Sequence, residues 1–239
     1  MTVSNSRDKL DLTAKTGAWL VALLIGGGAL ICLYLRIYFE AAAGLVSGLI
    51  FCWIQFGLNR RGNRLARRFG LRNPPGMQIA VSLLAFTSVF LGRFFSLYKR
   101  TVWFDKSQHV LYGMIFCFIG LVVFYLINIR QRSELTVLPV FISLFAVSFS
   151  LLCCFVWEIY EFTCDRLFQS NMQAWKQGLA HGLIDTMGDL IAGLAGALLV
   201  GCWSCRLLRR DPAGYYHRYI SGFFNQSDPY PAMDPGRLS

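Results

Sequence analysis

Acidic side chains are concentrated in one region of the second half of the chain. Glu158 and Glu161 close one strongly apolar segment, and Asp185 and Asp189 open the next. The whole chain holds only 13 acidic residues, so four of them in this region form an unusual concentration. Carboxylates at the ends of apolar segments can bind a cation or transfer protons. The region is therefore where we expect chemistry.

Residue spacing sharpens this expectation. Asp105 and His109 stand four residues apart, the later aspartate pair has the same spacing, and the glutamates stand three apart. On an α-helix both spacings put the two side chains on one face. Helical bundles that bind two metal ions project carboxylate and histidine ligands inward in this way. Carboxylates suit Mg, Mn or Ca, and an imidazole adds Fe or Zn, so the pattern allows a divalent metal but does not identify a cofactor. The predicted metal ligands are Asp105, His109, Glu158, Glu161 and Asp189, and these with Asp185 are the candidate catalytic residues.

The elements that must position these residues are membrane-spanning helices. Hydrophobic residues make up 55% of the 239 residues and charged residues only 15%, well below the share of about a quarter in soluble domains. Several uncharged apolar runs have the length of about 17 to 25 residues that a bilayer requires. We expect an all-α fold, a polytopic transmembrane helix bundle with about six spans. The spans are expected near residues 17–35, 41–58, 78–97, 110–129, 135–157 and 183–205.

Basic residues predict the orientation of the bundle. With residues 1–16 and the tail 209–239 in the cytoplasm, most of the 23 Lys and Arg residues lie on the cytoplasmic side, the arginine-rich loop 59–76 above all. Both termini are therefore expected to be cytoplasmic, the bundle to span residues 17–208, and the tail to be partly disordered. The net charge of +10 then serves topology, and no nucleic-acid partner is expected.

In this orientation the polar residues of four helices meet at the outer face. Arg93 ends the third span at the same depth and is expected to neutralise the carboxylates or to bind an anionic substrate headgroup. The alternative is that the acids form no site and are interfacial residues paired with Arg93, Lys99 or Lys106.

The chain resembles a known family over roughly residues 92–201. The motifs WFDKSQHVLYG, WEIYEF and NMQ…GLIDTMGDLIAGLAGA, in this order, are similar to those of YjdF-like bacterial inner-membrane proteins. A more distant similarity links the D-K-x-x-H motif and the late Asp motif to VanZ-like proteins, which are associated with glycopeptide tolerance. The YjdF-like resemblance implies a multi-pass protein of the bacterial inner membrane without a settled activity. Gly188 departs from the family pattern, where Trp is frequent, and Gly193 stands where the family often has a polar residue.

Three functions fit these observations. The first is metal-assisted chemistry on a lipid-linked or phosphorylated envelope substrate. The second is a transporter or lipid-handling protein that uses the same acids to bind a cation or protons. The third is a non-catalytic membrane scaffold. The sequence does not distinguish an enzyme from a non-enzyme. The expected partners are the lipid bilayer and an anionic or lipid-linked ligand.

Overall fold

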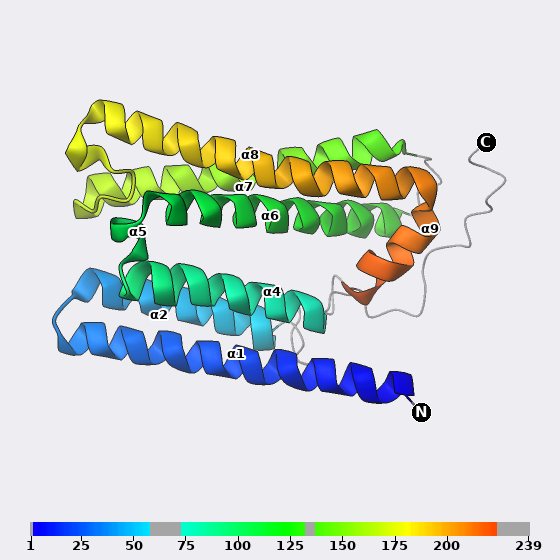
Figure 1. The fold of residues 1–239 in the computed structure, drawn as a ribbon, viewed down its shortest axis with the longest axis horizontal. Coiled ribbons are helices and arrows are strands. Elements are labelled where there is room, and N and C mark those ends of the chain that lie inside the picture. Colours follow the sequence, from blue (N-terminus) through cyan, green and yellow to red (C-terminus); the bar gives the residue numbers. More distant parts are fainter. Residues whose placement is uncertain (1, 58–72, 132–136, 224–239) are drawn as a thin grey trace. The chain divides into compact units, whose positions relative to one another are not determined.

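Helices make up nearly all of the structure, a computed structural model that describes residues 2–57, 73–131 and 137–223 (Figure 1). Within these ranges the chain forms no strand. Six helices are long and apolar enough to cross a membrane. The predicted all-α fold with about six spans is therefore confirmed. The arginine-rich part of the loop and residues 224–239 of the tail, on which two predictions rest, lie outside the described residues.

The chain divides into two compact units, and each is described by itself. Unit 1 contains the residues up to Phe104, together with Gly222 and Phe223. Its elements are α1 (Thr2–Tyr34), α2 (Tyr38–Cys52), the π-helical turn η1 (Trp53–Gly57), α4 (Pro75–Ala85), the π-helical η2 (Phe86–Phe94) and the short α5 (Leu97–Arg100). Its core forms where Ala18, Val21 and Ile25 of α1 pack against Phe51 of α2.

Buried amides inside unit 1 satisfy one another. The Gln55 side chain donates to the Gln78 carbonyl at 2.8 Å and to the Ser82 hydroxyl at 2.9 Å. Asn73 donates to the Gln55 side-chain oxygen at 3.1 Å. Polar side chains among membrane helices are stable when they find such partners, so this network joins η1 to α4.

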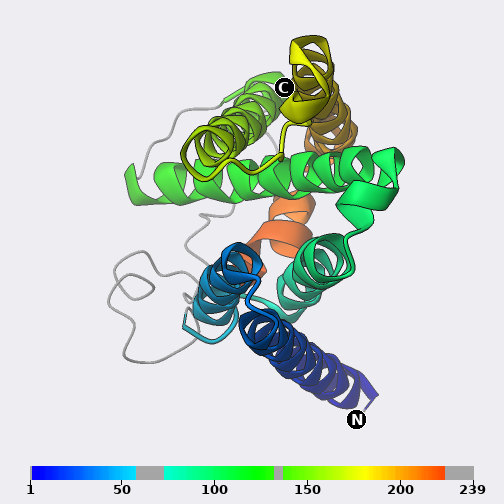
Figure 2. The ribbon, with the colours of Figure 1, turned by 90° about the vertical axis from the view of Figure 1, so that its left-hand side faces the viewer.

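Unit 2 holds three long helices. They are α6 (Val102–Gln131), which enters the unit at Asp105, α7 (Pro139–Phe168) and α8 (Leu179–Arg210). The shorter elements are η3 (Trp175–Gln177) between α7 and α8, then α9 (Pro212–Tyr215) and η4 (Tyr216–Ile220) after α8; η5 (Ser221–Phe223) follows. Figures 1 and 2 show α6, α7 and α8 side by side.

Local sequence explains where these helices begin and end. Pro139 occupies the first turn of α7, where its missing N–H costs nothing. Gln169 ends α7 in the left-handed conformation, and Gly178 precedes α8 with a φ of 125°, which glycine adopts without strain. The 30 residues of α7 rise about 45 Å, more than the roughly 30 Å of a hydrocarbon core. Its ends therefore extend into the headgroup regions.

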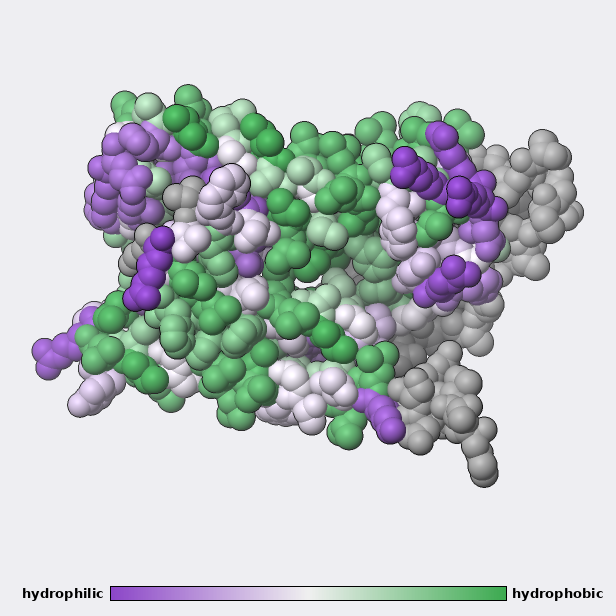
Figure 3. Space-filling view, viewed as in Figure 1, coloured by the Kyte–Doolittle hydropathy of each residue, from purple (hydrophilic) through white to green (hydrophobic). Residues whose placement is uncertain are grey.

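The surface matches a membrane environment. On the face of unit 2 that Figure 3 shows, apolar side chains cover the middle, and hydrophilic residues gather near the two ends of α8. Large side chains such as Leu183, Ile191 and Leu199 are more than half exposed along α8. Side chains of this kind are stable when lipid surrounds them.

Candidate functional site

The first turns of α6 supply three polar side chains. Because α6 begins at Val102, Asp105 and His109 both lie inside the helix, one turn apart on one face. The His109 Nε2 atom stands 3.8 Å from Asp105 Oδ1. Lys106, the residue after Asp105, points to the same region, and its Nζ lies 3.8 Å from Asp105 Oδ2.

The start of α8 supplies two aspartates that meet these residues. Lys106 Nζ donates to Asp185 Oδ1 and to Asp189 Oδ1, both at 2.8 Å, and to the Asp185 carbonyl at 3.1 Å. His109 Nε2 lies 3.6 Å from the same Asp189 Oδ1 atom. Three carboxyl groups thus surround one ammonium.

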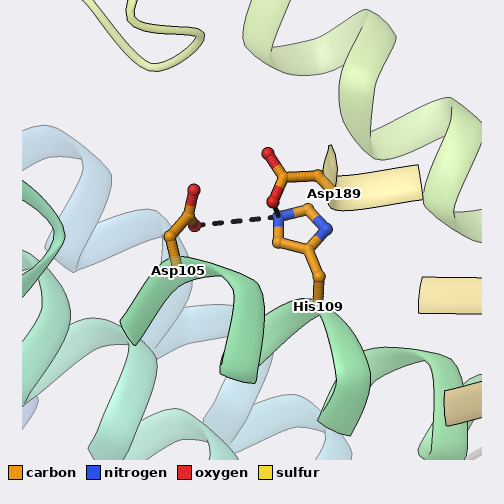
Figure 4. A group of neighbouring side chains, drawn as sticks. All are labelled: Asp105, His109 and Asp189. Atoms are coloured by element: carbon orange, nitrogen blue, oxygen red, sulfur yellow. Dashed lines mark ion pairs between the residues drawn. The ribbon is translucent and has the colours of Figure 1, made fainter. Parts of the chain in front are cut away.

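Asp105, His109 and Asp189 form a group whose ligand atoms lie close enough together to hold a metal ion (Figure 4). One ligand atom from each lies within 4.8 Å of the other two. Asp189 is only 1% exposed, and its Oδ2 atom is buried without a hydrogen-bond partner. A carboxylate oxygen in that state has a free lone pair for a cation.

The two glutamates of α7 are also buried. Glu161 Oε1 accepts a hydrogen bond from the Trp157 indole at 2.9 Å. Glu158 Oε2 is 3.3 Å from the amide nitrogen of Gln173, while Glu158 Oε1 is buried without a partner. Their hydrogen-bond partners thus come from α7 and from the loop after it.

Close packing of the three helices puts Glu158 at the same level as His109 and Asp189. A Cβ atom on Gly193 of α8 would lie 2.9 Å from the Cys154 sulfur of α7, and one on Gly113 of α6 would lie 2.0 Å from the Gly193 carbonyl oxygen. His109 and Asp189 stand four residues before their glycines, and Glu158 stands four after Cys154. Because α7 runs antiparallel to the other two helices, all three side chains lie one turn to the same side of this crossing.

The loop between α7 and α8 covers Glu158. Buried Asp165 accepts hydrogen bonds from the backbone nitrogens of Met172 at 2.8 Å and Gln173 at 2.9 Å, and from the Ser170 hydroxyl. These bonds fix Gln173, whose side chain donates to the Thr186 hydroxyl at 2.9 Å as well as approaching Glu158. The loop thus links α7 to the first turns of α8.

Arg93 belongs to unit 1, whereas the residues described above belong to unit 2. It lies in the last turn of η2 and donates to Glu40 Oε2 of α2 at 3.0 Å. Its predicted role toward the carboxylates and an anionic substrate stays a prediction. In unit 2 it is Lys106 that contacts the carboxylates. Such a pair also fits the alternative in which the acids are interfacial residues paired with a basic residue. The Lys99 side chain lies outside the described part.

Sequence reasoning placed neither Lys106 nor Gln173 among the site residues. The signal for Lys106 was its place inside the D-K-x-x-H motif, on the face that carries Asp105 and His109. Gln173 had a weaker signal, because a polar residue in a polar loop is ordinary.

The comparisons with known proteins decide the family. A family model described as "Predicted membrane protein (DUF2238)" matches residues 18–210. The chain belongs to the DUF2238 family. This DUF2238 protein is an integral membrane protein with several spanning helices, as its composition predicts, and the YjdF-like resemblance is consistent with the match. The more distant similarity to VanZ-like proteins stays a prediction. No curated protein and no solved structure matches the chain.

Proposed function

We propose that this protein binds a divalent cation through Asp105, His109 and Asp189, and that it catalyses a metal-assisted reaction on a phosphorylated or lipid-linked substrate. The observation that carries the proposal is the approach of three ligand atoms from α6 and α8 within 4.8 Å, beside a buried Asp189 oxygen that has no partner. The site opens, in this proposal, to the non-cytosolic face of the bacterial inner membrane.

The donor set supports a divalent cation. Two carboxylates and one imidazole suit Mn, Fe or Zn, and the charge of two ionised ligand carboxylates would match a charge of +2. Such an ion supplies a nucleophile by lowering the pKa of a bound water, and it orients phosphoryl oxygens.

The position of the site along the helices supports a substrate at headgroup depth. Asp105 lies within the first turn of α6, and Asp185 and Asp189 lie in the second and third turns of α8. These positions are near helix ends that reach the headgroup region, where phosphate groups of lipids lie. Glu158 fits the role of proton acceptor, because a buried carboxylate oxygen without a partner can take a proton from a nearby water.

Metal content of the purified protein tests the proposal. We expect the wild-type protein to retain about one Mn²⁺ per chain after dialysis against MnCl₂ and removal of free ion. Asp189→Asn and His109→Gln should each reduce Mn²⁺ affinity by about 10- to 100-fold. Glu40→Gln is the matched control, since Glu40 also lies in a spanning helix and pairs with a cation but belongs to unit 1.

Hydrolysis assays extend the test to the reaction. Phosphate release from a phosphatidic acid and from a polyprenyl pyrophosphate, in detergent with and without Mn²⁺, should depend on the metal and on Asp189. If the wild-type protein binds no Mn²⁺, Fe²⁺ or Zn²⁺, or if Asp189→Asn binds these ions unchanged, the proposed site is wrong.

A second candidate function is favoured by the Lys106–Asp189 ion pair. A lysine paired with a carboxylate that is 1% exposed inside a spanning helix is the kind of group that relays protons or coupling ions in transporters. Proton flux into vesicles that contain the protein, lost in Asp189→Asn and unaffected by chelators of divalent cations, would support this function over the metal-assisted reaction.

A further inference from the structure

We propose that the Lys106 ammonium is a displaceable counter-cation of the site, which competes with the divalent metal for Asp189. This inference rests on the proposed function, because it concerns how the same site is regulated. In the absence of the metal, Lys106 neutralises the carboxylates. When the metal binds, Lys106 leaves Asp189 and keeps its contacts with Asp185.

The contacts of Lys106 support a competition between its ammonium and the metal for Asp189. Its three ammonium hydrogens match three acceptors, Asp185 Oδ1, Asp189 Oδ1 and the Asp185 carbonyl, at 2.8, 2.8 and 3.1 Å. Asp189 Oδ1 is also the atom that His109 Nε2 approaches to 3.6 Å. One oxygen thus serves both the ammonium and the ligand group, and two cations cannot share it without repulsion.

The other Asp189 oxygen is available as a ligand for the metal. Asp189 Oδ2 is buried and has no hydrogen-bond partner, although Lys106 is bonded to the same carboxylate. The ammonium therefore satisfies only half of Asp189. A metal ion has ligand positions for both oxygens or for one with water, so it can satisfy what Lys106 leaves unsatisfied.

The surroundings of Lys106 leave it room to move. Its side chain is 21% exposed, whereas that of Asp189 is 1% exposed, so an exit toward the exposed side exists for the lysine. The stem passes over Gly188 of α8, where a Cβ atom would come within 3.2 Å of Lys106 Cε and 3.5 Å of Nζ. Lysine is a flexible chain with a compact charge, which makes displacement cheap in comparison with moving a helix.

Binding of Mn²⁺ to three variants tests the proposal. Lys106→Met removes the competing charge and keeps the stem, so we expect Mn²⁺ to bind about tenfold tighter than to the wild-type protein. Lys106→Arg keeps the charge and should bind Mn²⁺ as weakly as the wild type or more weakly. Gly188→Ala crowds the ammonium without changing any charge. It should also tighten Mn²⁺ binding, by a smaller factor than Lys106→Met.

Thermal unfolding in detergent gives a second readout. Without metal, Lys106→Met should unfold at a lower temperature than the wild type, because its carboxylates lack a counter-cation; saturating Mn²⁺ should remove this difference. Arg93→Gln is the matched control: it breaks the Arg93–Glu40 pair of unit 1, so its loss of stability should persist in Mn²⁺. If Lys106→Met folds only in the presence of Mn²⁺, the proposal is supported as well.

The outcomes separate this inference from the proposed function. Wild-type binding of Mn²⁺ with equal or weaker binding by Lys106→Met and Gly188→Ala overturns the competition and leaves the metal site standing. Absence of Mn²⁺ binding in the wild type and in every variant, with no rescue of stability, overturns both.

Discussion

Asp189 and Glu158 each keep one buried carboxylate oxygen without a hydrogen-bond partner. An unsatisfied buried acceptor costs about 1–3 kcal/mol, and more when it is charged. Both residues lie one turn from the crossing of α6, α7 and α8. Both residues would carry this free-energy cost at the same level of the helix bundle. A ligand that binds the two oxygens would remove it.

The Trp157–Glu161 hydrogen bond gives a prediction at this scale. Glu161 is 7% exposed and accepts from the indole nitrogen at 2.9 Å, so Trp157→Phe removes a partner from a buried carboxyl group while it retains an aromatic ring. We expect a loss of about 1 kcal/mol in the free energy of unfolding, measured by thermal unfolding in detergent.

Two comparisons check that the loss comes from this bond. Trp103→Phe, at a side chain that is 81% exposed, should leave the stability unchanged. In a Glu161→Leu background the effect of Trp157→Phe should largely disappear. Equal losses in both backgrounds would assign the effect to ring packing instead.

Part of the site follows from residue spacing alone. The separation of Asp105 and His109 predicts a shared helix face, and the two residues do approach each other across one turn. Which cation would lie among the carboxylates could not be predicted, because Arg93, Lys99 and Lys106 all end or begin apolar segments. The choice depends on the rotation of each helix about its axis, which sequence patterns do not specify within an all-apolar segment.

At the scale of elements, glycines control how closely the helices approach. A Cβ atom on Gly113 would lie 2.0 Å from the Gly193 carbonyl oxygen, and one on Gly196 would lie 2.0 Å from that of Val110. These are contacts with backbone, which cannot move aside as a flexible side chain can. Small residues at helix crossings permit this backbone approach in membranes.

Alanine substitutions test the crossing. Gly113→Ala and Gly196→Ala should each lower the free energy of unfolding by about 1–3 kcal/mol, since the helices must separate to admit the methyl group. They should also weaken Mn²⁺ binding, because His109 and Asp189 would move apart. Gly27→Ala in α1, where nothing lies within 4 Å, is the control and should be neutral or slightly stabilising. Unchanged stability of both crossing variants would contradict the tight packing.

Apolar runs were enough to predict the long helices, because a run of bilayer length has few alternative structures. The conformation of the loop between α7 and α8 was not predictable in the same way. It depends on left-handed residues at Gln169 and Ala174 and on the three hydrogen bonds to Asp165, which no local pattern indicates. Gln173 becomes a partner of Glu158 only through this conformation.

At the scale of the whole molecule, the orientation in the membrane is a prediction that the helices themselves leave open. The excess of basic residues on one side predicts cytoplasmic termini, and the loop between α7 and α8 then lies outside the cytoplasm. We expect a fluorescent protein fused after Ser239 to fluoresce, and alkaline phosphatase fused after Gln177 to be active. The reversed pair of results would place the proposed site at the cytoplasmic face.

The backbone contact between α6 and α8 also bears on ion selectivity. Helices in backbone contact at glycine cannot approach more closely at that crossing, which lies one turn from His109 and Asp189. Mg²⁺ demands bonds of about 2.1 Å in a regular octahedron, whereas larger ions accept longer and less regular ones. In the proposed metal site this crossing would set a lower limit on the width, and discrimination between Mg²⁺ and Mn²⁺ would begin at two glycines that touch neither ion.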